Sequence, residues 1–206
     1  MFRQAGDSVR LAAAGETLRQ DLADGAADFW EFPGNGFFQA NRFLLQAWLG
    51  RLRDLVPAGR PDTVELYCGS ALIGGYVRDR LGRGAGYDSF APGRQAARAN
   101  FRRLGYRGAF YQRDLYRDTV DLSERRPDLL LANPPRAGLN KRQLPLITRS
   151  EIRWLLYSSC NPQTLNRDLG YLLEGGYTCR ALEIFDFFPR TPHLDIVILL
   201  EYPGGP

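Results

Sequence analysis

The stretch "TVELYCGSALIGG", residues 63 to 75, decides the fold class. It begins as a short apolar strand that stops at Gly69, and a helical pattern follows from about residue 71 to residue 82. A glycine directly after a strand lets the backbone turn tightly and approach a ligand closely. A plain turn also favours glycine, so both interpretations of Gly69 stay open at this point.

The alternation of strand and helix continues to the end of the chain. It predicts right-handed crossovers and a parallel sheet with helices on both faces. Two final strands with no helix between them predict a hairpin. The predicted fold is therefore α/β and Rossmann-like: a doubly wound, mostly parallel sheet with a C-terminal antiparallel hairpin strand. The predicted strands are 63–69, 84–88, 108–114, 128–135, 152–160, 179–188 and 193–202, and the predicted helices are 40–56, 71–82, 92–105, 141–151 and 162–173.

The pattern changes near residue 36. Residues 1–35 are polar, rich in Ala and Gly and weakly periodic, which predicts an N-terminal arm or stub, with the main domain at 36–206. Helix 40–56 opens that domain with apolar residues at helical spacing, namely Phe43, Leu44, Ala47, Trp48 and Leu52.

Composition narrows the class of protein. The formal net charge is +4 and the pI is about 9.1, which favours a polyanionic partner such as a nucleic acid. The alternative is that the many arginines reflect the codon bias of a GC-rich genome, since Lys141 is the only lysine. Three widely spaced cysteines and one histidine, His193, predict neither a disulfide framework nor a metal or iron–sulfur site. We expect a reducing, cytoplasmic location, a monomer, and neither a signal peptide nor a membrane helix.

Polar or Gly/Pro-rich residues follow most predicted strands, where a doubly wound sheet binds its ligand. Asp88 ends the second strand about 20 residues after Gly69, the usual place for a carboxylate that binds ribose hydroxyls. The two residues predict a nucleoside cofactor, and the absence of a Gly-Lys-Ser/Thr motif argues against ATP. Asp114 either faces an adenine amino group or is a solvated loop acid.

The stretch "SSCNP", residues 158 to 162, places a cysteine between a strand and a helix. Asn161 suits the N-cap and Pro162 the first helical position, so Cys160 lies near the positive end of the helix dipole, which favours the thiolate. Most cysteines are buried hydrophobes, and that is the alternative. "NPPRAG", residues 133 to 138, similarly fixes Asn133 at a stiff strand exit.

"GFFQAN", "ELYCG", "NPPRAG", "YSSCNPQTLNRD" and "FFPRTPHLD", in this order and spacing, resemble the RNA uracil-5-methyltransferase family, from about residue 36 to residue 202. The resemblance implies a class I methyltransferase that uses S-adenosylmethionine (SAM) to form 5-methyluridine in tRNA or ribosomal RNA. It also implies Cys160 as the nucleophile and Asp195 as the base. Residues at positions of the family's SAM contacts are Gln39, Tyr67, Gly69, Asp88 and Asn133, and those on the RNA side are Arg136 and His193.

The chain departs from the family pattern at several positions. Ala71 and Leu72 stand where the family has Gly and Asn, Asn133 replaces an Asp, and Asp88 and Asp195 each replace a Glu. These departures keep open a degenerate relative that binds RNA or a partner without turnover. An amino-methyltransferase built on Asn-Pro-Pro is a further alternative, although such sites usually carry an aromatic ring where this chain has Arg136.

Overall fold

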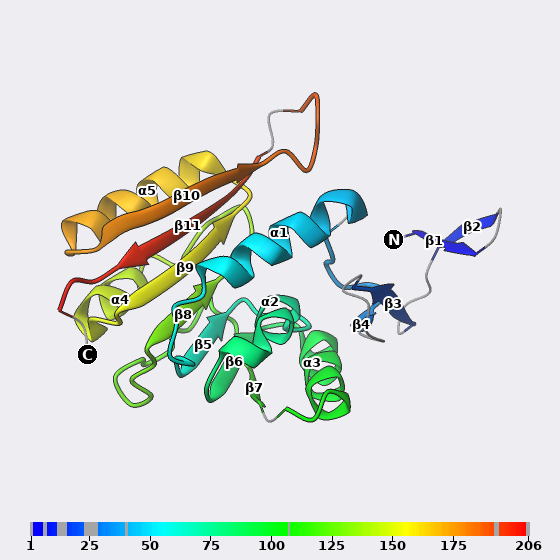
Figure 1. Cartoon of the computed structure of the whole chain (residues 1–206), viewed down its shortest axis with the longest axis horizontal. Helices are drawn as coiled ribbons and strands as arrows, with labels where there is room; N and C mark the ends of the chain where they lie inside the picture. Colours follow the sequence, from blue (N-terminus) through cyan, green and yellow to red (C-terminus); the bar gives the residue numbers. More distant parts are fainter. Residues whose placement is uncertain are drawn as a thin grey trace.

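The computed structural model describes residues 2–5, 8–11, 16–22, 29–39, 41–106, 108–191 and 194–204. Its main element is a seven-stranded sheet in the order β10-β11-β9-β8-β5-β6-β7 (Figure 1). β5 to β9 run parallel, whereas β11 is antiparallel to both β9 and β10. The predicted fold class is confirmed. The strands are β5 Thr63–Leu66, β6 Gly84–Asp88, β7 Gly108–Gln112, β8 Leu129–Ala132, β9 Trp154–Ser159, β10 Thr178–Phe185 and β11 Asp195–Glu201.

Helices cover both faces of the sheet, and residues of alternate parity on β8, β9 and β11 join different apolar cores. Val197 of β11 packs in the core that contains α1, whereas Ile198 packs in the core that contains α4 and α5. The helices are α1 Arg42–Leu55, α2 Leu72–Tyr76, α3 Ala91–Arg103, α4 Leu144–Ser150 and α5 Pro162–Glu174, with a 3₁₀ turn at Arg78–Arg80.

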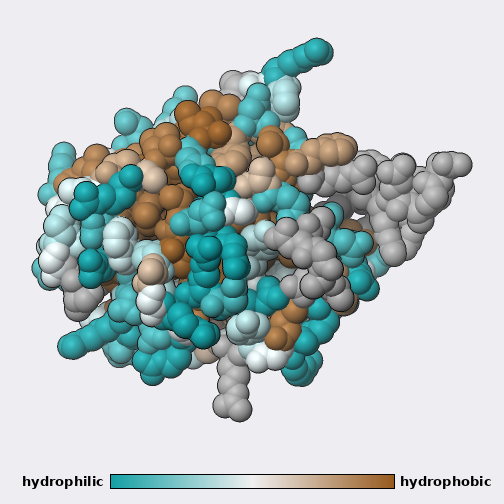
Figure 2. Space-filling model, viewed as in Figure 1, coloured by the Kyte–Doolittle hydropathy of each residue, from teal (hydrophilic) through white to brown (hydrophobic). Residues whose placement is uncertain are grey.

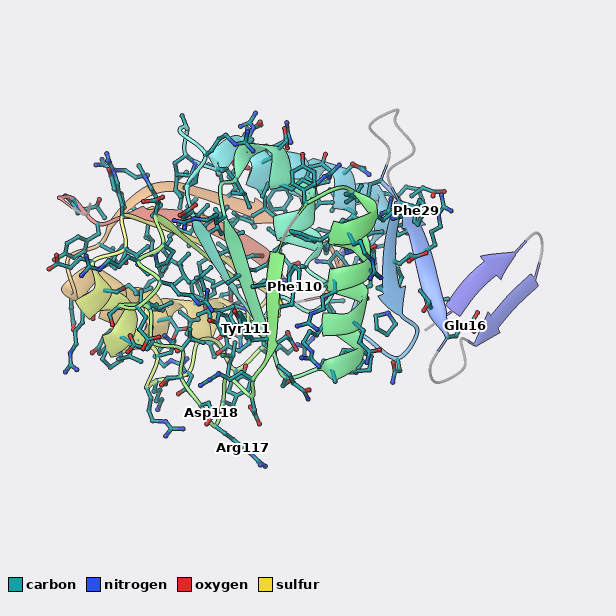
Figure 3. The ribbon with its side chains drawn as sticks, turned by 90° about the horizontal axis from the view of Figure 1, so that it is seen from below. Glu16, Phe29, Phe110, Tyr111, Arg117 and Asp118 are labelled. Atoms are coloured by element: carbon teal, nitrogen blue, oxygen red, sulfur yellow. The ribbon has the colours of Figure 1, made fainter. Side chains whose placement is uncertain are left out.

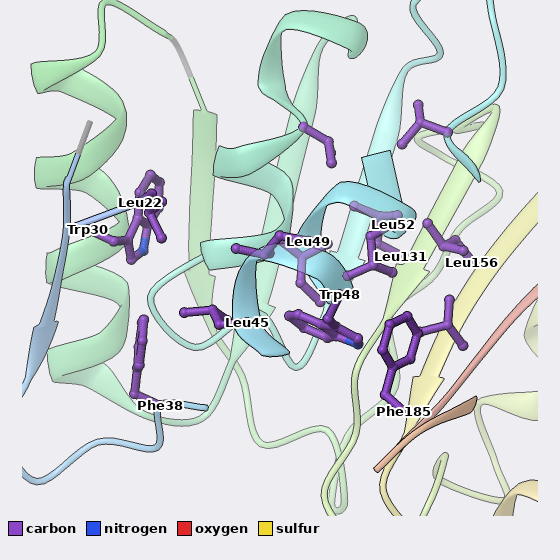
Figure 4. Packing of buried hydrophobic residues seen from close by; sticks show 14 of the residues in the cluster. Leu22, Trp30, Phe38, Leu45, Trp48, Leu49, Leu52, Leu131, Leu156 and Phe185 are labelled. Atoms are coloured by element: carbon purple, nitrogen blue, oxygen red, sulfur yellow. The ribbon is translucent and has the colours of Figure 1, made fainter. Parts of the chain in front are cut away.

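The buried stripe of α1 differs in part from the sequence prediction. Leu45, Trp48, Leu49 and Leu52 are the buried residues, and they lie over the sheet beside Leu131, Leu156 and Phe185 (Figure 4). Phe43, which the spacing had placed in the apolar set, is 81% exposed.

The predicted helix 71–82 is divided. α2 ends at Tyr76, and the chain continues as the 3₁₀ turn. Gly74 and Gly75 lower the helix propensity of this segment. Gly75 also admits the ring of Trp30, since a Cβ at this position would lie 1.9 Å from Trp30 Cη2.

Two hairpins precede the domain, and the sequence prediction contained no strand there. β1 Phe2–Ala5 pairs with β2 Ser8–Leu11, and β3 Thr17–Asp21 pairs with β4 Phe29–Pro33. β4 lies beside α3 (Figure 3). There the Asn100 side chain donates to the Glu31 carbonyl (2.8 Å) and accepts from the Glu31 N–H (3.1 Å). Trp30 is 1% exposed and donates its Nε1–H to the Ser70 carbonyl at 3.1 Å. The division into an arm and a domain at residue 35 stays a prediction.

Replacing Trp30 with alanine is expected to lower the free energy of unfolding by about 3–5 kcal/mol, because it opens a cavity beside Gly75. Urea unfolding followed by circular dichroism measures the loss. Phe43→Ala removes an exposed aromatic ring and is the control, with an expected change within about 0.5 kcal/mol. A Trp30→Ala variant as stable as the wild type would contradict the packing of β4 on the domain.

Candidate active site

A pocket of about 550 Å³ opens at the carboxyl ends of the parallel strands. This volume lies in the range of small-molecule sites. The pocket gathers eight of the sequence-predicted site residues, whereas Asp114 does not line it and His193 lies outside the described residues. The predicted residues that line it are Gln39, Tyr67, Gly69, Asp88, Asn133, Arg136, Cys160 and Asp195.

The antiparallel register of β11 brings Cys160 and Asp195 together. Ile196 pairs with Ser159, the last residue of β9, so the next positions outward are Asp195 and Cys160. β11 runs opposite to the parallel strands, and therefore its first residue, not its last, lies at the edge where those strands end. Asp195 is buried, and its Oδ2 accepts from Gln39 Nε2 at 2.7 Å.

Cys160 lies between β9 and α5 as the sequence predicted. Asn161 caps α5 by accepting from the Gln163 N–H at 3.1 Å, and Pro162 is the first helical residue. Burial raises the pKa of the Cys160 thiol and the Asp195 carboxylate raises it further, whereas the Arg136 guanidinium lowers it. Burial and Asp195 thus oppose the thiolate that the helix terminus was predicted to favour, and the effect of the helix terminus itself stays a prediction.

Burial also raises the pKa of Asp195, while the hydrogen bond from Gln39 opposes the shift. A carboxylate with a raised pKa holds a proton more readily near neutral pH, as a general base requires. The same Gln39 side chain has a second polar atom, Oε1, which is buried with no hydrogen-bond partner among the described residues. Trp48 Nε1 is a second such atom, and both residues line the pocket.

The loop after β5 holds Asp88 in place. Asp88 Oδ2 accepts from the Gly69 N–H (2.9 Å), and Oδ1 accepts from the Phe90 N–H (2.8 Å). Gly69 (φ +53°) and Ala71 (φ +57°) both adopt left-handed backbone. For alanine this conformation costs about 1–2 kcal/mol. Ala71 thus keeps a backbone shape suited to the family's glycine, at a steric cost.

The loop after β8 is tied to α5. The Arg136 carbonyl accepts from Asn161 Nδ2 (2.9 Å) and Thr164 Oγ1 (3.0 Å). Asp168 Oδ2 accepts from the Leu139 N–H (2.8 Å) and the Tyr157 hydroxyl (2.7 Å). The "TLNRD" segment therefore fixes the Asn133–Arg136 wall of the pocket, a role that the sequence analysis missed.

Glu65 is a second residue that the sequence analysis missed. It lies in β5, lines the pocket and is buried, and burial raises the pKa of its carboxyl to about 8. The Gly74 N–H donates to this carboxyl, and a Cβ on Gly74 would lie 2.5 Å from Glu65 Oε2. The signal in the sequence was a single acid inside an apolar strand.

Asp114 is not among the residues that line the pocket. It accepts from the Tyr116 N–H at 3.0 Å and pairs with Arg117 at 3.4 Å in the loop whose tip carries Arg117 and Asp118 (Figure 3). Of the two interpretations of Asp114, the structure supports a loop acid.

Two further properties of the described residues concern metal ions and membranes. No cluster of three or more His, Cys, Asp or Glu side chains among them is arranged to hold a metal ion. None of the helices in the described part of the chain is long and apolar enough to cross a membrane.

The sheet order, with its antiparallel β11 and a pocket at the strand ends, is that of the class I, Rossmann-like methyltransferases. The solved structure of Pyrococcus abyssi tRNA (uracil-54, C5)-methyltransferase in complex with S-adenosyl-L-homocysteine matches 96% of this chain and 48% of its own, with a TM-score of 0.75 and 26% identity.

The family model for tRNA (Uracil-5-)-methyltransferase matches residues 109–202. A curated "Uncharacterized RNA methyltransferase" of Leptospira interrogans is 36% identical over 174 residues, which are 84% of this chain and 42% of the relative. A protein of the same name from Streptomyces avermitilis is 33% identical over 199 residues, 94% of this chain and 42% of the relative. The resemblance to the RNA uracil-5-methyltransferase family is confirmed, and the chain spans less than half the length of these relatives.

The electrostatics of the pocket predict how Cys160 reacts with iodoacetamide. Because its pKa is raised, the rate of alkylation should rise with pH through a range above that of an ordinary thiol. Asp195→Asn removes a negative charge and should shift this profile to lower pH, whereas Arg136→Gln should shift it to higher pH. Mass spectrometry of Cys160, with exposed Cys179 as the reference in the same sample, measures both shifts. Identical profiles in all three proteins would show that the three groups are not coupled.

Proposed function

We propose that this chain is a SAM-dependent RNA methyltransferase domain that forms 5-methyluridine through a covalent bond between Cys160 and carbon 6 of uracil. One observation carries the proposal. Cys160, Asp195 and Asp88, which are the nucleophile, base and ribose ligand implied by the family motifs, line a single pocket. As parts of the proposal, the partner is tRNA or ribosomal RNA, residues 36–206 form the catalytic domain, and the chain acts as a cytoplasmic monomer.

The pocket fits SAM. Asp88, held by two backbone N–H groups, retains lone pairs for ribose hydroxyls. The orphaned Gln39 Oε1 is an acceptor suited to the ammonium of the methionine portion, and the orphaned Trp48 Nε1 is a donor suited to its carboxylate. Glu65 adds a carboxyl to this wall. When bound, SAM supplies an electrophilic methyl group.

Uracil carbon 5 is too weak a nucleophile to accept a methyl group by itself. Addition of the Cys160 thiolate to carbon 6 forms a carbon–sulfur bond and leaves an enolate with its electron pair available at carbon 5. Once carbon 5 carries the methyl group, Asp195 takes the carbon 5 proton. The electron pair re-forms the carbon 5–carbon 6 double bond, and the sulfur leaves as thiolate.

Specific interactions support the proposed roles of Cys160 and Asp195. The Arg136 guanidinium favours the Cys160 thiolate against the burial that opposes it. Gln39 fixes the Asp195 carboxylate by a 2.7 Å hydrogen bond. The target base must leave any stack to reach both groups, because Cys160 and Asp195 line a pocket.

A fluorine substituent tests this mechanism, since fluorine at carbon 5 cannot leave as a proton. RNA that contains 5-fluorouridine, incubated with the protein and SAM, should give a covalent adduct that survives denaturing electrophoresis. Cys160→Ala should abolish the adduct, and Cys179→Ala, the matched control at an exposed cysteine, should leave it unchanged. Asp195→Asn should still form the adduct, and with ordinary uridine RNA it should accumulate the adduct that wild type resolves.

The trap is run on a panel of tRNA and ribosomal RNA transcripts. An adduct that persists in Cys160→Ala, or that forms with none of the transcripts, would contradict the proposed nucleophile. Normal turnover by Asp195→Asn would exclude Asp195 as the base.

A binding module without turnover is the second candidate. It is favoured by the strained Ala71 and by apolar Leu72, which lines the pocket where the family has Asn. Titration calorimetry with SAM separates the two candidates, because a catalytic domain must bind the methyl donor and this module need not. An amino-methyltransferase is less well supported, since Arg136 lines the pocket beside the two prolines and offers no aromatic ring there.

A further inference from the structure

Three exposed phenylalanine rings lie on segments that contribute residues to the pocket. Phe37 is 82% exposed, Phe43 is 81% exposed and Phe188 is 36% exposed. Phe37 and Phe188 also line the pocket. Burial of such a ring would stabilise the fold by about 1.5–3 kcal/mol. A group of aromatic rings left in water beside a site marks a contact surface.

Phe37 is held outward by its neighbour. The ring of Phe38 stacks on Phe32 with centroids 4.0 Å apart, and Phe38 is buried. The segment before it is fixed by the Gly36 N–H, which donates to the Pro33 carbonyl at 2.8 Å. Phe38 therefore anchors the segment in the core while Phe37 faces the pocket and solvent.

Phe188 is presented by a similar arrangement. Phe187 is buried with its ring edge-on to Trp48 at 6.1 Å. The Phe188 carbonyl accepts from both the N–H (3.1 Å) and the hydroxyl (2.7 Å) of Thr191, which closes a turn. Again one ring of an adjacent pair is in the core and the other is at the rim.

Phe43 belongs to the same region. It lies in the first turn of α1, and its N–H donates to the cap residue Asn41 at 3.1 Å. Asn41 Nδ2 donates in turn to the Phe187 carbonyl at 3.0 Å. This pair of bonds joins the start of α1 to the turn that carries Phe188.

Exposed cations lie on the loop after β8, which also lines the pocket. Arg136 lines the pocket, and Lys141 and Arg142 follow in the next turn. Asn140 fixes this turn by donating to the Leu115 carbonyl at 2.8 Å. Aromatic rings together with cations at one site are the combination that binds single-stranded nucleic acid.

We propose that Phe37, Phe43 and Phe188 form a stacking platform for unpaired RNA bases that adjoin the target uridine. The inference rests on the proposed function, since it takes RNA as the substrate. It adds the surface that receives the strand and the form of RNA that fits it, a single-stranded segment. Stacking does not depend on base identity, so the platform contributes affinity and little sequence preference.

Phe43 is the ring to test first, because it is not among the residues that line the pocket. The probe is a fluorescein-labelled, unstructured oligoribonucleotide with one uridine among adenosines, measured by fluorescence anisotropy. Phe43→Ala should weaken binding about five-fold or more, as expected for loss of one stacked base. Phe43→Trp should restore the affinity, and neither variant should change the affinity for SAM measured by calorimetry.

The control variant is Ile184→Ala. Ile184 is 59% exposed on β10, where apolar side chains also reach the surface (Figure 2). It should bind RNA as the wild type does. The salt dependence gives a second readout: Phe43→Ala should keep the slope of log affinity against log salt, whereas Lys141→Ala should reduce it.

Wild-type RNA affinity in a Phe37→Ala/Phe43→Ala double variant would overturn the platform alone. So would a loss of self-association in sedimentation without a loss of RNA affinity, which would identify the rings as a protein contact. RNA binding that depends on the platform but never gives the fluorouridine adduct would instead overturn the proposed function.

Discussion

The antiparallel insertion of β11 beside β9 is the constraint on which the candidate site depends. A wholly parallel sheet would place the first residue of its last strand at the far edge, away from the ligand crevice. Here the pairing of Ile196 with Ser159 places Asp195 next to Cys160 across the two strands. A shift of one residue in this register would turn every β11 side chain to the opposite face and carry Asp195 out of the pocket.

The closeness of Asp195 and Cys160 also determines the electrostatics of the site. Asp195 and burial both oppose ionisation of Cys160, and Arg136 favours it. In the proposed reaction the Arg136 guanidinium is therefore as important as the Cys160 thiol. Its position depends on Asn161 and Thr164, which hold the Arg136 carbonyl from the first turn of α5. One short segment thus adjoins the proposed nucleophile and holds the backbone of the residue whose cation favours its thiolate.

Sequence reasoning succeeded where local chemistry decides the structure. The alternation of strands and helices, the Asn161 cap and the polar strand ends follow from periodicity and capping, and they led to the pocket. Sequence reasoning failed where a contact between distant parts of the chain determines the structure. Trp30 lies in a polar, weakly periodic stretch, and nothing local predicts that its ring packs beside Gly75 in α2. Phe43 matched the helical spacing, yet the direction of α1 across the sheet leaves it in water.

In the proposed function, the residues of this pocket catalyse transfer of a methyl group to carbon 5 of uridine in RNA. Nucleoside analysis by mass spectrometry tests it most directly: RNA is incubated with the protein and methyl-labelled SAM, digested, and its nucleosides are separated. We expect labelled 5-methyluridine with the wild type and none with Cys160→Ala. Label found instead on an exocyclic amine or a ribose hydroxyl, or 5-methyluridine that still forms in Cys160→Ala, would contradict it.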